Sequence, residues 1–275
     1  MRKYLKSRYV LPAAMLPAMM AVASSCAAGG HNGNEIPFSV AELFFELNHT
    51  DGDLGIHGMI DGDAWEQLNI TGPDENEMLD IDVSSNLQLQ GMTEIFFESA
   101  EPAFESDDAD EVTLPPEEFF ARFPEGTYEI EGLTIEGEDM ESETEVTHVM
   151  PAPPVVYVNG APAAEDCDAE DLPEVDFDEA VTLSWDPVTH SHPDIGSPNN
   201  TKLNGQNKVV NYEVVVEIDE TPYRTSAILP PDVTEYQVAQ EILALGDEIK
   251  FEVLVREASY NQTAVESCFV EADGG

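Results

Sequence analysis

The stretch "AVTLSWDPV", residues 180–188, begins a succession of short β-like segments that decides the fold of the C-terminal part of the chain. It is followed in order by "VVNYEVVVE" (209–217), "TSAILPPDVTEYQVAQEIL" (225–243) and "EIKFEVLVREASYNQT" (248–263). Each segment has the length and composition of a strand or a strand pair. The region before them, "VMPAPPVVYVNGAPAAEDCDAEDLPEVD" (149–176), is rich in Pro, Ala and acidic residues and indicates a boundary rather than a core.

In this order the segments resemble a fibronectin type III domain over about residues 175–272. Trp185 matches the tryptophan of the family's second strand, Tyr212 matches the aromatic residue of the third, and "FEVLVRE" matches the sixth. The resemblance implies a β-sandwich. One departure is Ile249, which stands where the family usually has the tyrosine of its tyrosine corner, so the resemblance implies that this corner hydrogen bond is missing.

The N-terminal part, residues 38–150, is also rich in short β-like runs bounded by Gly, Pro, Asn or Asp, at spacings typical of a sandwich. Only "PPEEFFARF" (115–123) predicts a helix, with Pro at its start and acids in its first turn. In "FPEGTYEIEG", Tyr128 follows Pro and Gly and opens an alternating strand, which resembles the tyrosine corner of immunoglobulin-like sandwiches. The alternative is a tyrosine that simply packs at a strand start.

The sequence therefore predicts an all-β protein with two tandem β-sandwich domains, the first immunoglobulin-like with a short helix and the second fibronectin type III-like. The expected order is a signal peptide (1–25), a tether (26–37), the immunoglobulin-like domain (38–150), a Pro- and acid-rich linker (151–174) and the fibronectin type III-like domain (175–272).

The first residues have the composition and the order of segments that are typical of an export signal. A basic "MRKYLKSRYV" precedes a short apolar run and small residues, and the apolar run is shorter than the ~20 residues that span a bilayer. Ala23-Ser24-Ser25-Cys26 resembles a lipobox, which implies lipid attachment at Cys26 and a membrane-anchored lipoprotein of the cell envelope, outer-membrane, periplasmic or surface-exposed. The alternative is ordinary signal cleavage after Ala23 or Ala28 and a free protein.

Charge is the most unusual property of the chain, with 57 acidic against 10 basic residues. Four of the basic residues lie in the first ten positions, so the remainder carries 57 acids against six basic residues, a net charge of about −51. Such a surface repels nucleic-acid phosphates and anionic lipids, so no nucleic acid is expected as a partner and the membrane is reached through a lipid anchor only. The self-repulsion also predicts greater stability at high salt.

Two cysteines, Cys167 and Cys268, remain after Cys26. An exported protein meets an oxidising compartment, so a disulfide that closes a loop of about 100 residues is one interpretation. Two unpaired thiols are the other.

"HTDGDLGIHGMIDGDAW" (49–65) places four carboxylates within thirteen positions, as two Asp-Gly-Asp triplets. An EF-hand is rejected, because Ile56 stands where that loop requires Gly and Gly62 stands where it requires Glu. If the residues between the triplets form a strand, Asp53 and Asp61 lie about 26 Å apart, too far to share one ion.

Each triplet has the composition of a turn, and a half-buried strand between two turns is the favoured interpretation. The remaining alternative is weak Ca²⁺ binding by one triplet with help from Asn48 or Asp74. The candidate metal ligands are Asp51, Asp53, Asp61 and Asp63.

The connection "THSHPDIGSPNNTKLNGQNK" (189–208) is longer than the fibronectin type III family usually has, and long loops on a rigid sandwich commonly carry recognition. His190, His192 and Asp194 are its candidate binding residues. A His-x-His pair can bind a transition metal, but a third ligand is not evident, so a solvated loop is favoured.

Nucleophile elbows, zinc-peptidase motifs and phosphate loops do not occur in the sequence. The favoured function is a non-catalytic envelope binding or spacer protein, whose partner is an envelope protein or polysaccharide. One alternative is a hydrolase of an envelope polymer, which a pocket lined by His57, Trp65 and acids would favour. Another is a Ca²⁺-stabilised structural protein; no other cofactor is expected.

Overall fold

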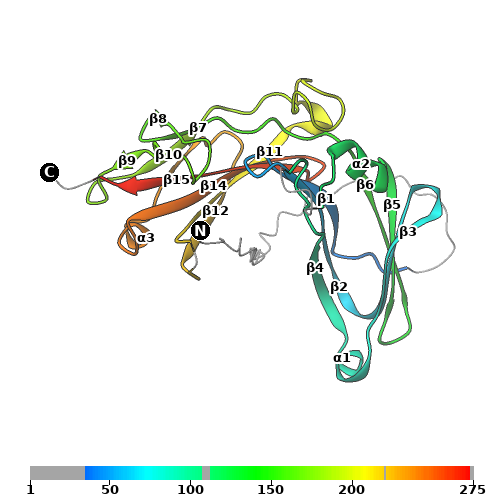
Figure 1. Ribbon diagram of the computed structural model, residues 1–275. Coiled ribbons are helices and arrows are strands. Elements are labelled where there is room, and N and C mark those ends of the chain that lie inside the picture. The colour runs from blue at the N-terminus through cyan, green and yellow to red at the C-terminus, as the bar shows by residue number, and fades with distance from the viewer. Residues whose placement is uncertain (1–34, 107–111, 220, 273–275) are drawn as a thin grey trace. The chain divides into compact units, whose positions relative to one another are not determined.

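Figure 1 shows the computed structural model, which describes residues 35–106, 112–219 and 221–272. The elements lie in the unit that begins at Glu35. The earlier ones are β1 (Val40–Asn48), β2 (Asp53–Gly72), η1 (Pro73–Glu75), β3 (Asn76–Asp82), α1 (Ser85–Gln90), β4 (Met92–Glu98), α2 (Pro116–Arg122), β5 (Gly126–Thr134) and β6 (Asp139–Val146). The later ones are β7 (Val156–Val158), β8 (Ala161–Pro162), β9 (Glu174–Val175), β10 (Thr182–Trp185), η2 (Gly205–Asn207), β11 (Val209–Glu217), β12 (Arg224–Leu229), β13 (Glu235–Gln237), α3 (Gln240–Leu243), β14 (Glu248–Glu257) and β15 (Gln262–Glu271).

Two hydrophobic cores organise these elements. We call residues 35–150, which build the first core, the first module, and residues 151–272, which build the second, the second module. The predicted all-β class with sheets packed as a sandwich is confirmed. Among the described residues, no helix is both long enough and apolar enough to cross a membrane.

The second module encloses its core between two sheets, one in the order β13-β10-β7-β8 and the other containing β12-β11-β14-β15. The core side chains alternate along each strand, as a one-sided strand requires. Trp185 on β10 packs on Tyr212 of β11 with 5.3 Å between ring centroids. Both residues expected from the fibronectin type III resemblance therefore lie in the core, and Ile249 is fully buried beside them.

The first module is built around the 20-residue strand β2, which changes partners along its length. Its first half pairs with β1 and β4, and its second half pairs with β3 and β5, with register shifts between Asp61 and Gln67. An isolated parallel bridge joins Ile36, before β1, to Met140 of β6, which lies in the first core. The tyrosine corner at Tyr128 is confirmed, because its hydroxyl donates to the carbonyl oxygen of Pro124 at 3.1 Å.

Three expectations need correction. The second triplet is not a turn: β2 runs through Asp61–Asp63, because its backbone has strand partners before and after this point. Gly62 suits this passage, since a Cβ there would approach Phe38 and Met140 within 3 Å. The other two corrections concern α1 and the linker.

Helix α2 appears where the sequence predicts a helix, but α1 is a second helix in a region where only short β-like runs and that one helix were expected. The expected linker 151–174 carries β7 and β8. Its Val156 and Val158 are buried in the second core, and β7 pairs with β10. A short apolar run beside several Pro residues does not by itself predict a strand, and this three-residue strand is held by its pairing with β10 and β8.

Candidate functional site at the module junction

The two modules share one sheet. Strand β1 of the first module pairs in parallel with β15 of the second, with Glu46 opposite Gln262 and Asn48 opposite Ala264. This edge of β15 would otherwise have free backbone groups; β1 covers its start at Gln262–Ala264, and β9 covers its end at Val270 and Glu271. The order β12-β11-β14-β15-β1-β2-β5-β6 therefore runs through both modules.

Asn261 is the centre of this junction. Its side chain is 1 % exposed and leaves the turn between β14 and β15. Its Oδ1 accepts the backbone N–H of Phe45 on β1 at 2.9 Å, and its Nδ2 donates to the carbonyl oxygens of Thr147 at 2.8 Å and Val149 at 3.1 Å. One amide thus satisfies buried backbone groups of two separate segments of the first module.

Arg256 adds a charged contact beside this amide. Its guanidinium lies 4.5 Å above the ring of Phe44 on β1, and its Nη2 is 3.6 Å from Oε2 of Glu42. Its Nε donates to the carbonyl oxygen of Tyr260 in the turn after β14. A cation over an aromatic ring is stabilised most when it is shielded from water, and the side chain of Arg256 is 12 % exposed.

A third contact comes from residues 189–204, which we call the junction loop. The N–H of His192 donates to the carbonyl oxygen of Met150 at 2.7 Å, and the N–H of Ser197 donates to that of His148 at 2.8 Å. Ile195 packs against the first core. The loop expected to be solvated and free for recognition is therefore docked on the first module, because its backbone donors and one apolar side chain find partners there.

The predicted loop residues separate in the structure. His190 and Asp194 are exposed, whereas His192 is 3 % exposed. Nδ1 of His192 accepts the backbone N–H groups of Asp194 at 3.1 Å and Ile195 at 2.9 Å, and its Nε2 is 3.4 Å from Nδ1 of His49. Since Nδ1 of His192 is occupied by two donors, the three residues do not present a common set of free ligand atoms.

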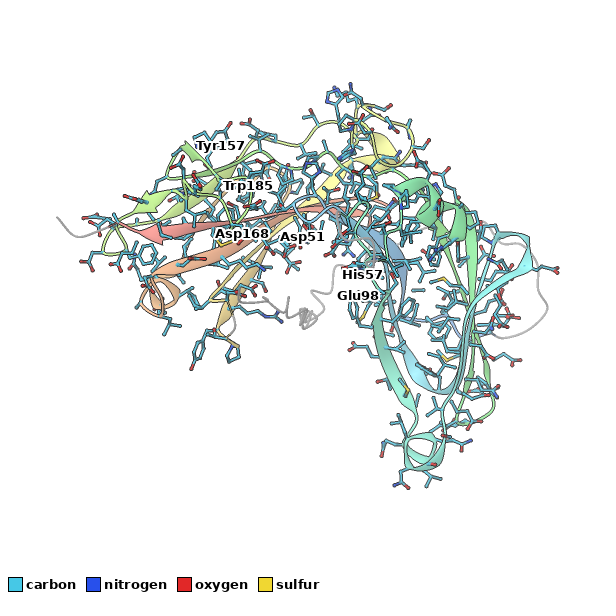
Figure 2. All side chains as sticks on the ribbon, viewed as in Figure 1. Asp51, His57, Glu98, Tyr157, Asp168 and Trp185 are labelled. Atoms are coloured by element: carbon cyan, nitrogen blue, oxygen red, sulfur yellow. A yellow bond between two sulfur atoms is a disulfide. The ribbon has the colours of Figure 1, made fainter. Side chains whose placement is uncertain are left out.

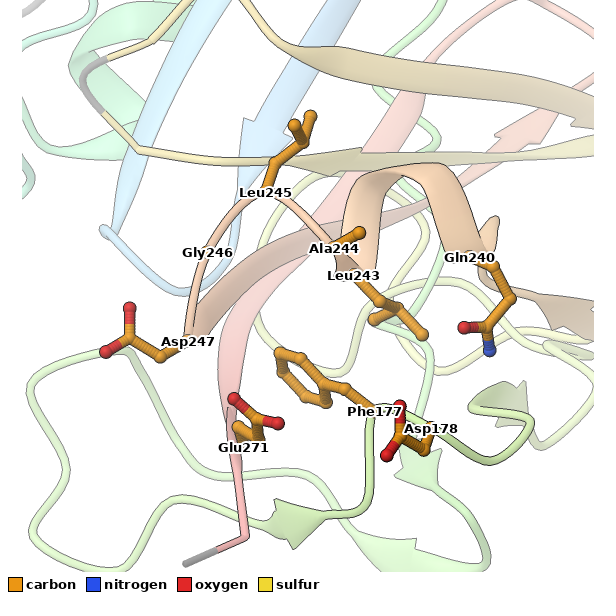
Figure 3. A pocket seen from close by; sticks show the side chains of 9 residues that line it. All are labelled: Phe177, Asp178, Gln240, Leu243, Ala244, Leu245, Gly246, Asp247 and Glu271. Carbon is orange, nitrogen blue, oxygen red and sulfur yellow. The ribbon is translucent and has the colours of Figure 1, made fainter.

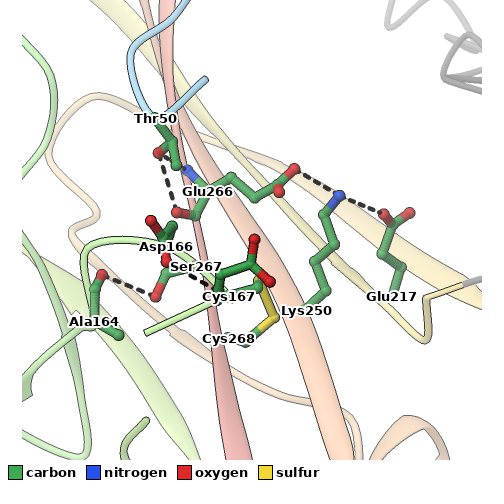
Figure 4. The surroundings of a disulfide bond; sticks show 10 residues. Thr50, Ala164, Asp166, Cys167, Glu217, Lys250, Glu266, Ser267 and Cys268 are labelled. Atoms are coloured by element: carbon green, nitrogen blue, oxygen red, sulfur yellow. Dashed lines mark hydrogen bonds and ion pairs between the residues drawn. A yellow bond between two sulfur atoms is a disulfide. The ribbon is translucent and has the colours of Figure 1, made fainter. Parts of the chain in front are cut away.

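Cys167 and Cys268 are joined by a disulfide that fastens the segment before β9 to strand β15 (Figure 4). Next to it, the hydroxyl of Ser267 donates to the carbonyl oxygen of Ala164 at 3.0 Å. On the neighbouring strands Lys250 pairs with Glu266 at 2.6 Å and with Glu217 at 3.6 Å.

The four triplet aspartates lie at opposite ends of the β1–β2 hairpin. Asp51 lies in the connecting turn, where the side chain of Asn48 donates to its Oδ2 at 3.3 Å, and Asp53 begins β2. Asp61 pairs with Val40 at the far end, so the geometry keeps the triplets apart. Among the described residues, no group of three or more His, Cys, Asp or Glu side chains has the arrangement of a metal site.

His57 forms a small charged cluster with two glutamates on β1 and after β4. Its Nε2 lies 3.2 Å from Oε1 of Glu101 and its Nδ1 lies 4.0 Å from Oε2 of Glu46. Burial by itself would lower the pKa of His57. The hydrogen bond to Glu101 and the charge of Glu46 act in the opposite direction and outweigh burial, so the net effect is a raised pKa. Figure 2 shows His57 near Glu98, whose pKa burial raises.

Trp65 does not line a pocket with His57. Its side chain is fully buried in the first core, whereas the His57 ring lies between Phe44 and Phe96. A separate hollow of about 520 Å³ lies at the second module (Figure 3), where Phe177 and Leu243 meet the exposed Asp178, Asp247 and Glu271. None of the residues predicted from the sequence lines it. Cys26 lies outside the described residues.

Sequence reasoning missed Asn261, Arg256 and His49. An Asn in a strand connection normally indicates a turn, and a basic residue in a strand normally indicates a solvated face. The segment "EASYNQT" (257–263) is recognisable as a strand connection, but nothing in it indicates that Asn261 is buried.

No protein-family model and no curated protein matches the chain. Among solved structures, the FN1–FN3 domains of chicken CNTN1 match 86 % of this chain and 65 % of that chain, at 8 % identity and a TM-score of 0.32. The human OSCAR ligand-binding domain matches 83 % of this chain and 97 % of its own, at 12 % identity and a TM-score of 0.24. A structure from a 1.5-MDa bacterial ice-binding adhesin matches 87 % of this chain and 66 % of that chain, at 12 % identity and a TM-score of 0.25. This chain thus spans less than two thirds of the chicken structure, and its fold assignment rests on its own strand pairing.

Proposed function

We propose that the chain is an exported, lipid-anchored cell-envelope protein that acts as a non-catalytic binding or spacer module. The observation that carries the proposal is the junction, where one sheet, one buried amide and a docked loop join the modules. Domains in one chain normally move relative to each other unless their interface is large and well packed. A joined pair keeps a partner at a set distance from the membrane.

The acidic surface supports the kind of partner proposed. With a net charge of −47 the chain repels nucleic acids and anionic polymers. The proposed partner is therefore an envelope protein or an uncharged or cationic polysaccharide, and the membrane is held only through the lipid on Cys26.

The anchoring part is tested by intact-mass analysis and membrane fractionation of the full chain made in a bacterial host. The wild type is expected to carry a diacylglyceryl-modified Cys26 at its N-terminus and to sediment with membranes. The Cys26→Ser variant is expected in the soluble exported fraction. An unmodified wild-type N-terminus would reject the lipid anchor.

The binding part is tested with the lipid-free protein immobilised and exposed to purified envelope polysaccharide and to envelope protein extract at 0.15 M salt. Saturable retention of one identified component, lost on competition with free protein, is the expected result. Turnover of the polysaccharide without retention would favour the hydrolase instead.

A further inference from the structure

The docked junction loop brings His192 against His49 of the turn after β1, and the contacts of His192 require a neutral ring. Nδ1 of His192 accepts two backbone N–H groups, so it carries no proton, and the ring's proton is therefore on Nε2. Nε2 of His192 lies 3.4 Å from Nδ1 of His49, so its N–H donates and Nδ1 of His49 accepts this hydrogen bond. The two rings lie 5.4 Å apart between centroids.

A second proton has no place in this arrangement. On Nδ1 of His192 it would face the N–H groups of Asp194 and Ile195. On Nδ1 of His49 it would face the Nε2–H of His192. Either event replaces a hydrogen bond by the opposition of two donors, and at the buried His192 the unpaired groups cost their desolvation as well.

We propose that this histidine pair is an acid-sensitive latch: when His192 is protonated, the junction loop is released from the first module. The latch is more than a local contact, because His192 sits in the same loop segment as Ile195, which packs on the first core, and as Ser197, whose N–H binds His148. The β1–β15 pairing does not depend on these rings, so the modules stay attached while the loop detaches.

The neighbouring charges do not compensate for a proton. From the loop itself, His192 is faced by Asp194, which is exposed, and His190 and Lys202 lie on the adjoining bridge. From the turn after β1 it is faced by His49, and the 147–152 segment contributes His148, whose ring is bound to the carbonyl oxygen of Phe123. Burial and the neighbouring His49 lower the pKa of His192 to about 4, against a weaker opposite effect of Asp194, and burial also lowers the pKa of His49.

The sign of the effect follows from these directions. The folded pKa of His192 lies below its unfolded value of about 6.5, so the unfolded or released loop binds more protons between pH 4 and 6.5. The docked loop is fully stabilised above pH 6.5 and loses stability as the pH falls toward 4.

His192→Asn is the matched test, because the Asn side-chain oxygen can accept the N–H groups that Nδ1 accepts and does not titrate. The control is His190→Asn on the exposed histidine two positions earlier. The readout is amide hydrogen exchange of the mature chain at pH 7 and pH 4, corrected for intrinsic rates, followed in residues 192–197 and in the core strand β14.

In the wild type and in His190→Asn, protection of residues 192–197 is expected to fall about tenfold or more between pH 7 and pH 4, while β14 stays protected. In His192→Asn the change is expected to stay within about twofold. Unchanged wild-type protection, or equal loss in His192→Asn, overturns the latch. If His192→Asn does not fold, a wild-type NMR titration decides: a His192 pKa near 6.5, or a proton on Nδ1 at pH 7, contradicts the proposal.

Discussion

Substituting Asn261 by Ala removes the amide that joins the two modules. The substitution deletes four hydrogen bonds, one from Phe45, two to Thr147 and one to Val149, and leaves the N–H of Phe45 unpaired in a fully buried position. An unpaired buried donor costs about 1–3 kcal/mol, and each lost bond to a carbonyl oxygen costs about 0.5–1.5 kcal/mol. We therefore expect a loss of about 2–6 kcal/mol in the free energy of unfolding, a large share of the about 5–15 kcal/mol of an average domain.

The two tryptophans make the assay specific for each module. Trp65 lies in the first core and Trp185 in the second, and neither Nε1 has a hydrogen-bond partner among the described residues. Replacing one of them by Phe leaves a single fluorophore without breaking a hydrogen bond. In urea, the two single-tryptophan proteins are expected to unfold in coincident transitions, because the modules unfold together.

With Asn261→Ala added, both transitions are expected to move to lower urea and to separate. The control is Asn199→Ala on an exposed side chain of the junction loop, which we expect to change stability by less than about 0.5 kcal/mol. A loss below about 1 kcal/mol for Asn261→Ala, or separate transitions already in the parent proteins, would refute the reasoning about the junction.

Gly196→Ala should lower the melting temperature by several degrees, because Gly196 has a φ of +85° and a Cβ there would lie 2.2 Å from the carbonyl oxygen of His148. An unchanged melting temperature argues against the docked loop. Because the pKa of His57 is raised in the folded protein, its contribution to stability is complete below about pH 6.5 and is lost as the pH rises through the folded pKa. The stability advantage of wild type over His57→Gln should therefore shrink from pH 6 to pH 9. A constant difference would dismiss this role. Breaking the Cys167–Cys268 disulfide with a reductant should cost up to about 4–5 kcal/mol, measured by urea unfolding with and without the reductant; equal midpoints would show that the bond constrains little. The net charge of −47 predicts a melting temperature that rises from dilute buffer to molar NaCl, and a flat or falling curve contradicts the self-repulsion argument.

Much of the fold follows from local pattern. The alternation in β11 and β14 predicts strands, and the Pro and Gly before Tyr128 predict its corner, because these features act within a few residues. The start of β2 at Asp53 follows from the turn formed by Asn48 and Asp51.

The junction could not be predicted in this way, because it depends on segments more than a hundred residues apart. Phe45 and Asn261 are separated by 216 positions, and nothing in either neighbourhood indicates the other. The same holds for His49 and His192, separated by 143 positions. The path of β2 through Asp61–Asp63 also depends on distant partners. The composition of this polar, Gly-containing stretch does not favour a strand, but β2 pairs with β1 before it and with β5 after it.

We propose that the junction makes the two modules one rigid unit. The most direct test of this proposal is a distance measurement by pulsed electron paramagnetic resonance between spin labels at Gln90 on α1 and Glu235 on β13, both exposed, at neutral pH. A rigid junction should give a single narrow distance distribution that broadens in Asn261→Ala. A broad distribution in the parent protein, unchanged by Asn261→Ala, would show that the modules move independently.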